Sequence, residues 1–532
     1  MSLQALRKEY IPNIPCEISD INITVQESSL VKVDKKIENI FEKTSKSPLL
    51  SFISGKGKKA NFLKVGVLFS GGPAPGGHNV IAGVFDSLKK IDNRSQLYGF
   101  LNGPDGILKN KYIVITKELI DNYRNCGGFD LIGSSRTKIE TEEQFKQALN
   151  NVKSLDLDGL IIIGGDDSNT NALYLAEFFL KENFKTKVVG VPKTIDGDLK
   201  NEYILISFGF DTACKVYSEM IGNLARDAMS SKKYYHFIKL MGRSASHIAL
   251  ECALKTQPNF VLIGEEIFKG KKGLDQIVKD IAEMVIKRAK QNKNYGIILI
   301  PEGIIEFIYE IKMLIGELNK ILSSYEKKFK SFEDKEKIDF VLSKLSNSSK
   351  KSFLYLPKDI QKQLLLKRDP HGNVQVSQIE TEKLLIDKVK EELKNKKDIK
   401  FNPIAHFFGY EGRASFPSNF DANYCYALGF VASSILKEGY TGYICAISNL
   451  NKSVNEWRGK AIPLASMMNM EIRKGKEKAV IKKALVDLKG KPFEMFVSLR
   501  DKWIIEDNYK YPGPIQFFGD KKLTDSCPII IK

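Results

Sequence analysis

Three short segments of the chain combine glycines, carboxylates and a lysine at spacings suited to binding phosphate groups. The first is SGGPAPGGHN, from Ser70 to Asn79, which lies between a predicted strand and a predicted helix. Glycines let backbone N–H groups converge on an anion, and the N-terminus of the following helix adds partial positive charge. The segment therefore predicts a phosphate-binding loop, with an ordinary tight turn as the alternative interpretation.

The second segment, GGDDS from Gly164 to Ser168, directly follows the apolar run GLIII. Two adjacent carboxylates at the end of a buried strand are costly unless a cation lies between them and a ligand. Mg²⁺ bound to phosphate oxygens is the natural candidate. Because Asp and Ser are also favoured at helix N-caps, the alternative is that these residues simply begin the next helix.

The third segment, PKTIDGD from Pro192 to Asp198, again follows a predicted strand. It places a lysine, a hydroxyl and two carboxylates within one turn, so that a cation can hold phosphate while a carboxylate accepts a hydroxyl proton. The alternative is an ordinary Asp-Gly turn. Of the three segments, this one is the hardest to explain by packing alone.

The elements around these segments alternate between strand and helix patterns from Leu63 to about Ile447. Short runs rich in valine and isoleucine are separated by longer helical patterns, which predicts parallel sheets wrapped by helices. In open α/β sheets, ligands gather at the carboxyl ends of the strands. The clearest strand candidates are LKVGVLFS, LDGLIIIGG, TKVVGVP, YYHFIKLMG, FVLIGEE, YGIILIPEG, IAHFFGYE and YICAIS.

The composition is that of a globular protein with room for more than one core: 532 residues, 43% apolar and 27% charged. The formal net charge of +18 comes mostly from lysines interleaved with acids along predicted helices, so we expect a solvated surface and no nucleic-acid partner. Seven scattered cysteines and five isolated histidines predict neither disulfides nor a zinc site. Without a signal-peptide or membrane-spanning pattern, we expect a cytoplasmic protein with no membrane partner.

In this order and spacing, the three segments resemble the phosphofructokinase family. The resemblance is reinforced by GSSR at 133–136, MGR at 241–243, PEG at 301–303 and GYEGR at 409–413, and it runs from about Leu63 to Gly459. The segments PKTIDGD, KYYHFIKLMGR and GYEGRASFPSNFDANYCYALG are similar to the corresponding motifs of the long, pyrophosphate-dependent branch of the family, which is found in plants and some bacteria. The resemblance implies reversible phosphorylation of fructose 6-phosphate at O1 by pyrophosphate, in glycolysis and gluconeogenesis.

The fold that we expect is α/β, with two Rossmann-like, three-layer domains, mainly parallel sheets, a helical insertion and terminal extensions. The insertion is placed where the strand rhythm stops and lysine- and glutamate-rich amphipathic patterns take over. The expected boundaries are 1–60 for an N-terminal extension, 61–210 for a domain that binds pyrophosphate and Mg²⁺, 211–303 with 401–478 for a domain that binds fructose 6-phosphate, 304–400 for the insertion, and 479–532 for a C-terminal extension packed on the domains.

Two positions indicate the phosphoryl donor. ATP-using relatives usually carry GGDGS and PGTIDND, with glycines where this chain has Asp167 and Lys193. A carboxylate about 4 Å from the α-phosphate of ATP repels it by roughly 4 kcal/mol at an effective dielectric constant of about 20. Lys193 supplies a fixed positive charge for the transferring or departing phosphate. In the alternative interpretation, Asp167 caps a helix, Lys193 faces solvent and ATP binds.

The resemblance also implies roles on the donor side. Asp196 is expected to be the general base that takes the proton of the C1 hydroxyl, assisted by Lys193 and Asp167. Asp166 is expected to hold Mg²⁺, directly or through water. Gly72 and Arg136 are expected to bind the donor phosphates.

On the sugar side, the resemblance implies a binding turn, an acid that binds a hydroxyl and an arginine that grips the 6-phosphate. In this family part of the sugar site comes from a neighbouring subunit, so we expect a homodimer with a shared active site. The residues expected to bind the sugar or its phosphates are Thr194, Met241, Gly242, Arg243, Glu302, Tyr410 and Arg413, with Lys233 and Tyr234 reaching the neighbouring site.

Three other functions compete with this one. The nearest is an ATP-dependent phosphofructokinase, and a second is a non-catalytic regulatory subunit on the same fold. Intact Asp166, Asp196, Lys193 and Arg243 argue against the regulatory subunit, because such subunits typically lose the catalytic carboxylate. A dinucleotide-binding oxidoreductase is weakened by the absence of a GxGxxG turn.

Overall fold

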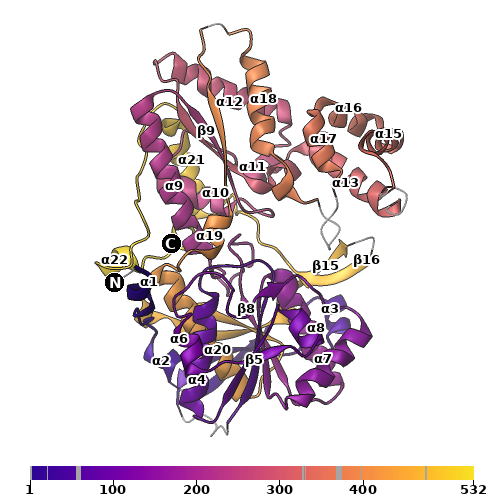
Figure 1. The fold of residues 1–532 in the computed structure, drawn as a ribbon, viewed down its shortest axis with the longest axis vertical. Helices are drawn as coiled ribbons and strands as arrows, with labels where there is room; N and C mark the ends of the chain where they lie inside the picture. Colours follow the sequence, from indigo (N-terminus) through magenta and orange to yellow (C-terminus); the bar gives the residue numbers. More distant parts are fainter. Residues whose placement is uncertain are drawn as a thin grey trace.

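Two sheets, one above the other along the long axis, organise the chain (Figure 1). The computed structural model describes residues 3–20, 22–55, 62–325, 329, 331–366, 374–396, 398–473 and 476–532. We call the part built on the ten-stranded sheet the larger domain, and the part built on the four-stranded sheet the smaller domain. Both termini lie on the same side, near the junction of the two domains.

The larger sheet has the order β1-β2-β14-β13-β8-β7-β3-β4-β5, with β6 beside β3. Its central strands are parallel and its outer pairs are antiparallel. All six residues of β7 are buried, as expected for a parallel strand covered on both faces. The strands are β1 (Ile23–Leu30), β2 (Pro48–Ser54), β3 (Lys64–Ser70), β4 (Gln96–Phe100), β5 (Tyr112–Val114), β6 (Ser134–Ser135), β7 (Gly159–Gly164), β8 (Lys187–Pro192), β13 (Tyr443–Ser448) and β14 (Arg458–Pro463).

Helices cover both faces of the larger sheet. Alternate residues of β3 enter opposite cores: Val65 and Val67 pack with α4 (Gly77–Ile91) and α20 (Asn419–Lys437), whereas Leu68 packs with α7 (Glu142–Ser154) and α8 (Asp166–Lys181). This alternation follows from the two-residue period of a strand. The shorter helices of this domain are α1 (Leu3–Lys8), α2 (Cys16–Ser19), α3 (Lys35–Ile40), α5 (Pro104–Leu108), α6 (Lys117–Asp121), η3 (Val454–Glu456) and η4 (Leu464–Met467).

The smaller sheet is fully parallel, with the order β10-β11-β9-β12. One face packs on α9 and α10 and the other on α12 and α18, so both domains have three layers and the predicted fold class is confirmed. The elements are β9 (Tyr235–Leu240), β10 (Phe260–Val261), β11 (Gly296–Pro301), β12 (Pro403–Phe408), α9 (Phe210–Ser231), α10 (His247–Thr256), α11 (Gly264–Lys269), α12 (Leu274–Ala289), α18 (Thr381–Leu393) and α19 (Tyr410–Ala414).

Helices also fill the region predicted as an insertion, and they do not form a core of their own. Their apolar residues, such as Leu314, Phe353 and Leu385, share one cluster with Phe237 and Ile298 of the smaller sheet. The elements are η1 (Glu302–Glu306), α13 (Tyr309–Ser324), α15 (Asp334–Lys344), α16 (Asn347–Tyr355), α17 (Lys358–Leu364) and η2 (Val376–Gln378).

Three expectations differ from the structure. The stretch 401–478 does not stay in one domain, because β12 joins the smaller sheet while β13 and β14 join the larger one. The N-terminal extension supplies β2, which pairs with β14, so it is part of the larger sheet. In FVLIGEE only Phe260 and Val261 form a strand, because α11 begins at Gly264. An apolar run predicts a strand but does not say which sheet it joins.

The C-terminal region packs along both domains. A hairpin of β15 (Met468–Arg473) and β16 (Lys476–Ile481) contacts α8, and α21 (Lys491–Trp503) contacts α10. Short elements α22 (Lys521–Thr524) and η5 (Ile529–Ile531) end the chain. No disulfide joins the seven cysteines, all of which belong to the described ranges. Among the helices that the structure describes, none is both long and apolar enough to cross a membrane.

Candidate active site

A cavity of about 1110 Å³ lies between the two domains. The segments that follow β3, β7 and β8 line one side, and the segments that follow β9 and β11 line the other. The cavity therefore occupies the carboxyl ends of both sheets, as predicted. Residues of the helical region, including Phe329, Lys337 and Gln375, complete the wall.

The first glycine-rich segment reaches the cavity with only its leading residues, Ser70 to Pro73. Ser168 Oγ donates to Ser70 Oγ at 2.8 Å, and Lys193 Nζ donates to Gly72 O at 2.9 Å, so the three predicted segments meet here. The expectation that the N-terminus of α4 faces the ligand is not supported. A Cβ on its N-cap, Gly76, would lie 2.3 Å from Cys425 Sγ, so this helix end is packed against α20.

The helix that does begin at the cavity is α8, with Asp166 and Asp167 in its first turn. Gly165 is its N-cap and no side chain caps it, so neither aspartate is used as a cap. Asp167 Oδ1 lies 3.2 Å from Lys138 Nζ. Asp166 Oδ2 is buried and accepts no hydrogen bond within the described part of the chain; the nearest cation is Lys483 Nζ at 3.5 Å.

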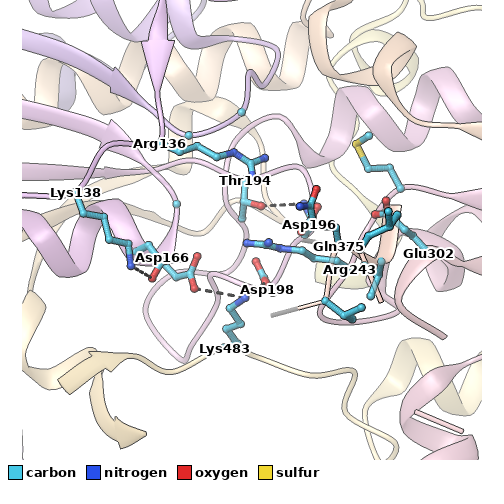
Figure 2. Close-up of a pocket in the computed structure, with 18 of the residues that line it drawn as sticks. Arg136, Lys138, Asp166, Thr194, Asp196, Asp198, Arg243, Glu302, Gln375 and Lys483 are labelled. Atoms are coloured by element: carbon cyan, nitrogen blue, oxygen red, sulfur yellow. Dashed lines mark hydrogen bonds and ion pairs between the residues drawn. The ribbon is translucent and has the colours of Figure 1, made fainter. Parts of the chain in front are cut away.

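The loop after β8 brings its charged groups into the same cavity. Asp196 N donates to Thr194 Oγ1 at 3.1 Å, which fixes the turn between Lys193 and Asp196. Figure 2 shows Asp196 and Asp198 on this loop, with Arg243 reaching toward them from the smaller domain. Carboxylates and cations from both domains thus face one space.

Burial moves the pKa of three groups in the cavity. Desolvation lowers the pKa of Lys193 to about 8, although the Asp196 carboxylate opposes the shift. Desolvation, followed by repulsion from Asp196, raises the pKa of Asp198 to about 7. Burial likewise raises the pKa of Glu302 to about 7, against the hydrogen bond that it accepts. A bound polyanion would favour the charged form of Lys193, so the site is electrostatically prepared for phosphate.

The sugar-side segments meet at the ends of β9 and β11. Gly242 N donates to Glu302 Oε2 at 3.0 Å, which ties MGR to PEG. Gly303 must be glycine, because a Cβ there would lie 2.0 Å from Arg243 O. Met241, Arg243 and Glu302 line the cavity, and Gly242 supports them through its backbone.

The GYEGR segment reaches across to the donor side. A Cβ on Gly72 would lie 2.8 Å from Arg413 Nη2, so this guanidinium stands directly over the first glycine-rich loop. Tyr410 is 65% exposed, and its ring centroid lies 5.2 Å from Arg413 Cζ. Both residues line the cavity, as does Arg136.

Lys233 and Tyr234 lie elsewhere. They precede β9, whereas Met241 follows it, and a six-residue strand spans about 20 Å at roughly 3.3 Å per residue. Neither residue is among those that line the cavity in the described chain, and both face solvent, Tyr234 with 36% of its surface exposed.

Six charged residues that line the described cavity have no role predicted from the sequence: Lys138, Asp198 and Lys483, and from the helical region Asp334, Lys337 and Lys362. Lys138 lies two residues after Arg136, so proximity to GSSR was its available signal. Asp198 is the second carboxylate of PKTIDGD, and the sequence alone does not indicate its role. Lys483 enters from the C-terminal region, in a stretch that matches none of the recognised segments.

Comparisons with known proteins agree with the family resemblance of the sequence motifs. A family model described as phosphofructokinase matches residues 64–436. The chain is 51% identical over 535 residues to pyrophosphate–fructose 6-phosphate 1-phosphotransferase of Entamoeba histolytica, covering 99% of this chain and 98% of that one. It is 52% identical over 500 residues to subunit beta of the enzyme of that name from Solanum tuberosum, covering 92% and 86%. A solved pyrophosphate-dependent phosphofructokinase from Nitrosospira multiformis aligns with a TM-score of 0.56 at 17% identity, covering 87% of this chain and 96% of that one.

Proposed function

The chain belongs to the phosphofructokinase family, and from this premise we propose that it transfers a phosphoryl group from pyrophosphate to fructose 6-phosphate. The products are fructose 1,6-bisphosphate and inorganic phosphate, in a reversible step of glycolysis and gluconeogenesis. The proposal is supported by the relatives of about half identity whose names state this reaction. Because sugar phosphates are charged and do not cross membranes freely, we place the enzyme in the cytoplasm.

The observation that carries the choice of donor is the pair of charges at the start of α8 and after β8. Asp167 and Lys193 both line the cavity, and Lys193 is buried against the backbone of Gly72. A buried ammonium beside a glycine-rich loop favours a compact polyanion. The Asp167 carboxylate disfavours any further phosphate attached to the two that react.

In the proposed reaction Asp196 takes the proton of the C1 hydroxyl as its oxygen attacks one phosphorus atom of pyrophosphate. The bond between that phosphorus and the bridging oxygen breaks, and inorganic phosphate leaves with the electron pair. Lys193 and Arg136 stabilise the charge that develops on the phosphate oxygens. The hydrogen bond from Asp196 N to Thr194 Oγ1 holds the base on the loop that also carries Lys193.

The sugar binds on the side of the smaller domain. Arg243 supplies positive charge for its 6-phosphate, Arg413 lies between the sugar and the donor loop at Gly72, and Glu302 accepts hydrogen bonds from the sugar hydroxyls. The remaining contacts come from Met241 and Tyr410. This division places the acceptor hydroxyl between the two domains, next to Asp196.

Mg²⁺ is the cation that the family implies, and the residues present fit it. Asp166 offers a buried carboxylate oxygen that lacks a hydrogen bond from any described residue. Among the described residues no three acidic, histidine or cysteine side chains are placed to hold a metal ion together, so most ligands of the ion would be phosphate oxygens and water. When bound, Mg²⁺ would neutralise phosphate charge at this position.

We also propose that the active unit is at least a homodimer. Lys233 and Tyr234 are exposed about 20 Å from this chain's own cavity, which suits residues that serve a neighbouring one. A mixed assembly with a second kind of subunit is the alternative, given the subunit naming of the plant relative. An active monomer at assay concentration would contradict both arrangements.

A coupled assay tests the proposed function. Fructose 1,6-bisphosphate formation is measured with Mg²⁺ and either pyrophosphate or ATP. The kcat/KM for pyrophosphate should exceed the kcat/KM for ATP by about 30-fold, because the roughly 4 kcal/mol of repulsion from Asp167 is offset by roughly 2 kcal/mol of attraction to Lys138. Faster turnover with ATP would overturn the choice of donor, and no turnover with either would favour a regulatory subunit.

A further inference from the structure

The segment from Ile481 to Val486 crosses from the larger domain to the smaller one beside the cavity. At its start, Ile481 N donates to Thr170 Oγ1 of α8 at 3.0 Å. At its end, Val486 N donates to Glu265 Oε1 of α11 at 3.0 Å. We call residues Ile481–Val486 the crossing segment. Because backbone N–H groups at both ends donate to side chains of the two domains, the backbone of the segment has a defined position.

Lys483 is the side chain of this segment that enters the cavity (Figure 2). Its Nζ donates to Ser244 Oγ at 2.8 Å and lies 3.5 Å from Asp166 Oδ2 and 3.9 Å from Asp198 Oδ2. Ala484 N donates to the backbone oxygen of Asp198 at 2.8 Å, so the next residue anchors the lysine to the catalytic loop. The Lys483 ammonium therefore faces α8, the loop after β8 and the turn after β9.

The distances from Lys483 Nζ to the carboxylates of Asp166 and Asp198 show that the lysine is loosely paired. A charge-assisted hydrogen bond between an ammonium and a carboxylate is about 2.7 to 2.9 Å long, so neither Asp166 nor Asp198 holds Lys483 tightly. The side chain is 26% exposed, and that surface opens into the cavity lined by Asp166 and Lys193. A cation fixed by its backbone and only loosely paired is placed to receive an anionic oxygen.

We propose that Lys483 binds an oxygen of the donor pyrophosphate, which makes the crossing segment part of the active site. This inference rests on the proposed function. Lys193 enters the cavity from the loop after β8, and Lys483 enters it from the crossing segment, beside Asp166 and Asp198. The two lysines therefore come from different segments of the chain, and both attract the phosphate oxygens of the donor.

Direct binding separates this role from a structural one. Pyrophosphate with Mg²⁺ is titrated by calorimetry into the full-length protein without the sugar. Lys483→Met should raise the dissociation constant for pyrophosphate by about 10- to 100-fold, as expected for a lost hydrogen bond to a charged group. Lys483→Arg should recover most of the loss. The matched control is Lys482→Met, which removes an exposed lysine from the same segment and should leave binding unchanged.

Steady-state kinetics give the second readout. The KM for pyrophosphate should rise in Lys483→Met, while the KM for fructose 6-phosphate should change less than about threefold. If Lys483→Met does not fold, Lys483→Gln keeps a partner for Ser244 without the charge and gives the same answer. Wild-type affinity in the folded variant, or equal losses for both substrates, would overturn the inference. If the wild type itself gives no heat with pyrophosphate, the proposed function fails instead.

Discussion

The ion pair between Asp167 and Lys138 allows the donor preference to be worked through quantitatively. An α-phosphate oxygen about 4 Å from the Asp167 carboxylate is repelled by about 4 kcal/mol at an effective dielectric constant of about 20. Lys138 Nζ lies 3.2 Å from Asp167 Oδ1, so it attracts the same oxygen from about 7 Å with roughly 2 kcal/mol. The intact pair therefore penalises ATP by about 2 kcal/mol, or about 30-fold.

Substitutions of the two partners should then act in opposite directions. Asp167→Asn removes the repulsion and keeps the attraction, so the preference for pyrophosphate should fall by up to about 1000-fold. Lys138→Met leaves the carboxylate uncompensated, and the preference should rise about 30-fold. The double variant should lie between, with a preference about 30-fold below that of the wild type. Asp167→Gly, which also clears space, should resemble Asp167→Asn.

The assay is the ratio of kcat/KM for pyrophosphate to kcat/KM for ATP, measured at saturating fructose 6-phosphate for the wild type and the four variants. Thermal unfolding of each protein is the control, because Asp167 also lies in the favourable first turn of α8. The electrostatic reasoning would be refuted by an unchanged ratio in Asp167→Asn. A Lys138→Met ratio that moves in the same direction as that of Asp167→Asn would refute it as well.

Three further predictions concern the base, the buried acid and the exposed pair. Asp196→Asn should lower kcat by about 10²- to 10⁴-fold with little change in sugar affinity, and near-normal turnover would remove it from the role of base. Burial raises the pKa of Glu302 to about 7, so the contribution of this group to stability should be fully present below about pH 4.5 and be lost as pH rises through 7. The free energy of unfolding of Glu302→Gln should therefore exceed that of the wild type by up to about 3 kcal/mol at pH 8, and by almost nothing at pH 4.5. A difference in melting temperature that does not depend on pH would contradict this. Lys233→Ala should raise the KM for fructose 6-phosphate. Mixing this variant with Arg243→Ala protein should form mixed dimers in which one of the two active sites is intact, so activity should be partly restored. No recovery of activity would argue against shared sites.

The sequence allowed prediction of the residues whose neighbours in the chain reveal them. Asp166, Lys193 and Asp196 follow buried strands, and the carboxyl ends of parallel strands meet at one edge, so their convergence follows from local patterns. Lys138 and Lys483 are different, because each reaches the cavity through tertiary contacts that leave no periodic signal.

The same limit explains the errors in the fold. The strands β13 and β14 are apolar runs that fit either sheet, and the choice depends on pairing with β8 and β2. The turn GPAPGG predicts a helix at α4 but not the packing of that helix against α20, which keeps its N-terminus from the ligand. Local patterns determine which elements form, and long-range packing determines where their ends point.

The pairing of β2 with β14 has a consequence for how the chain reaches this fold. Ser51 pairs with Lys460, so the larger sheet closes only when residues about 400 positions apart meet. During synthesis β1 and β2 emerge long before β14, so the edge of β2 that pairs with β14 stays unpaired until most of the chain has followed. Such distant contacts slow folding, and an open strand edge favours pairing with other chains. The edge of β2 is therefore exposed to pairing with other chains while the protein is being made.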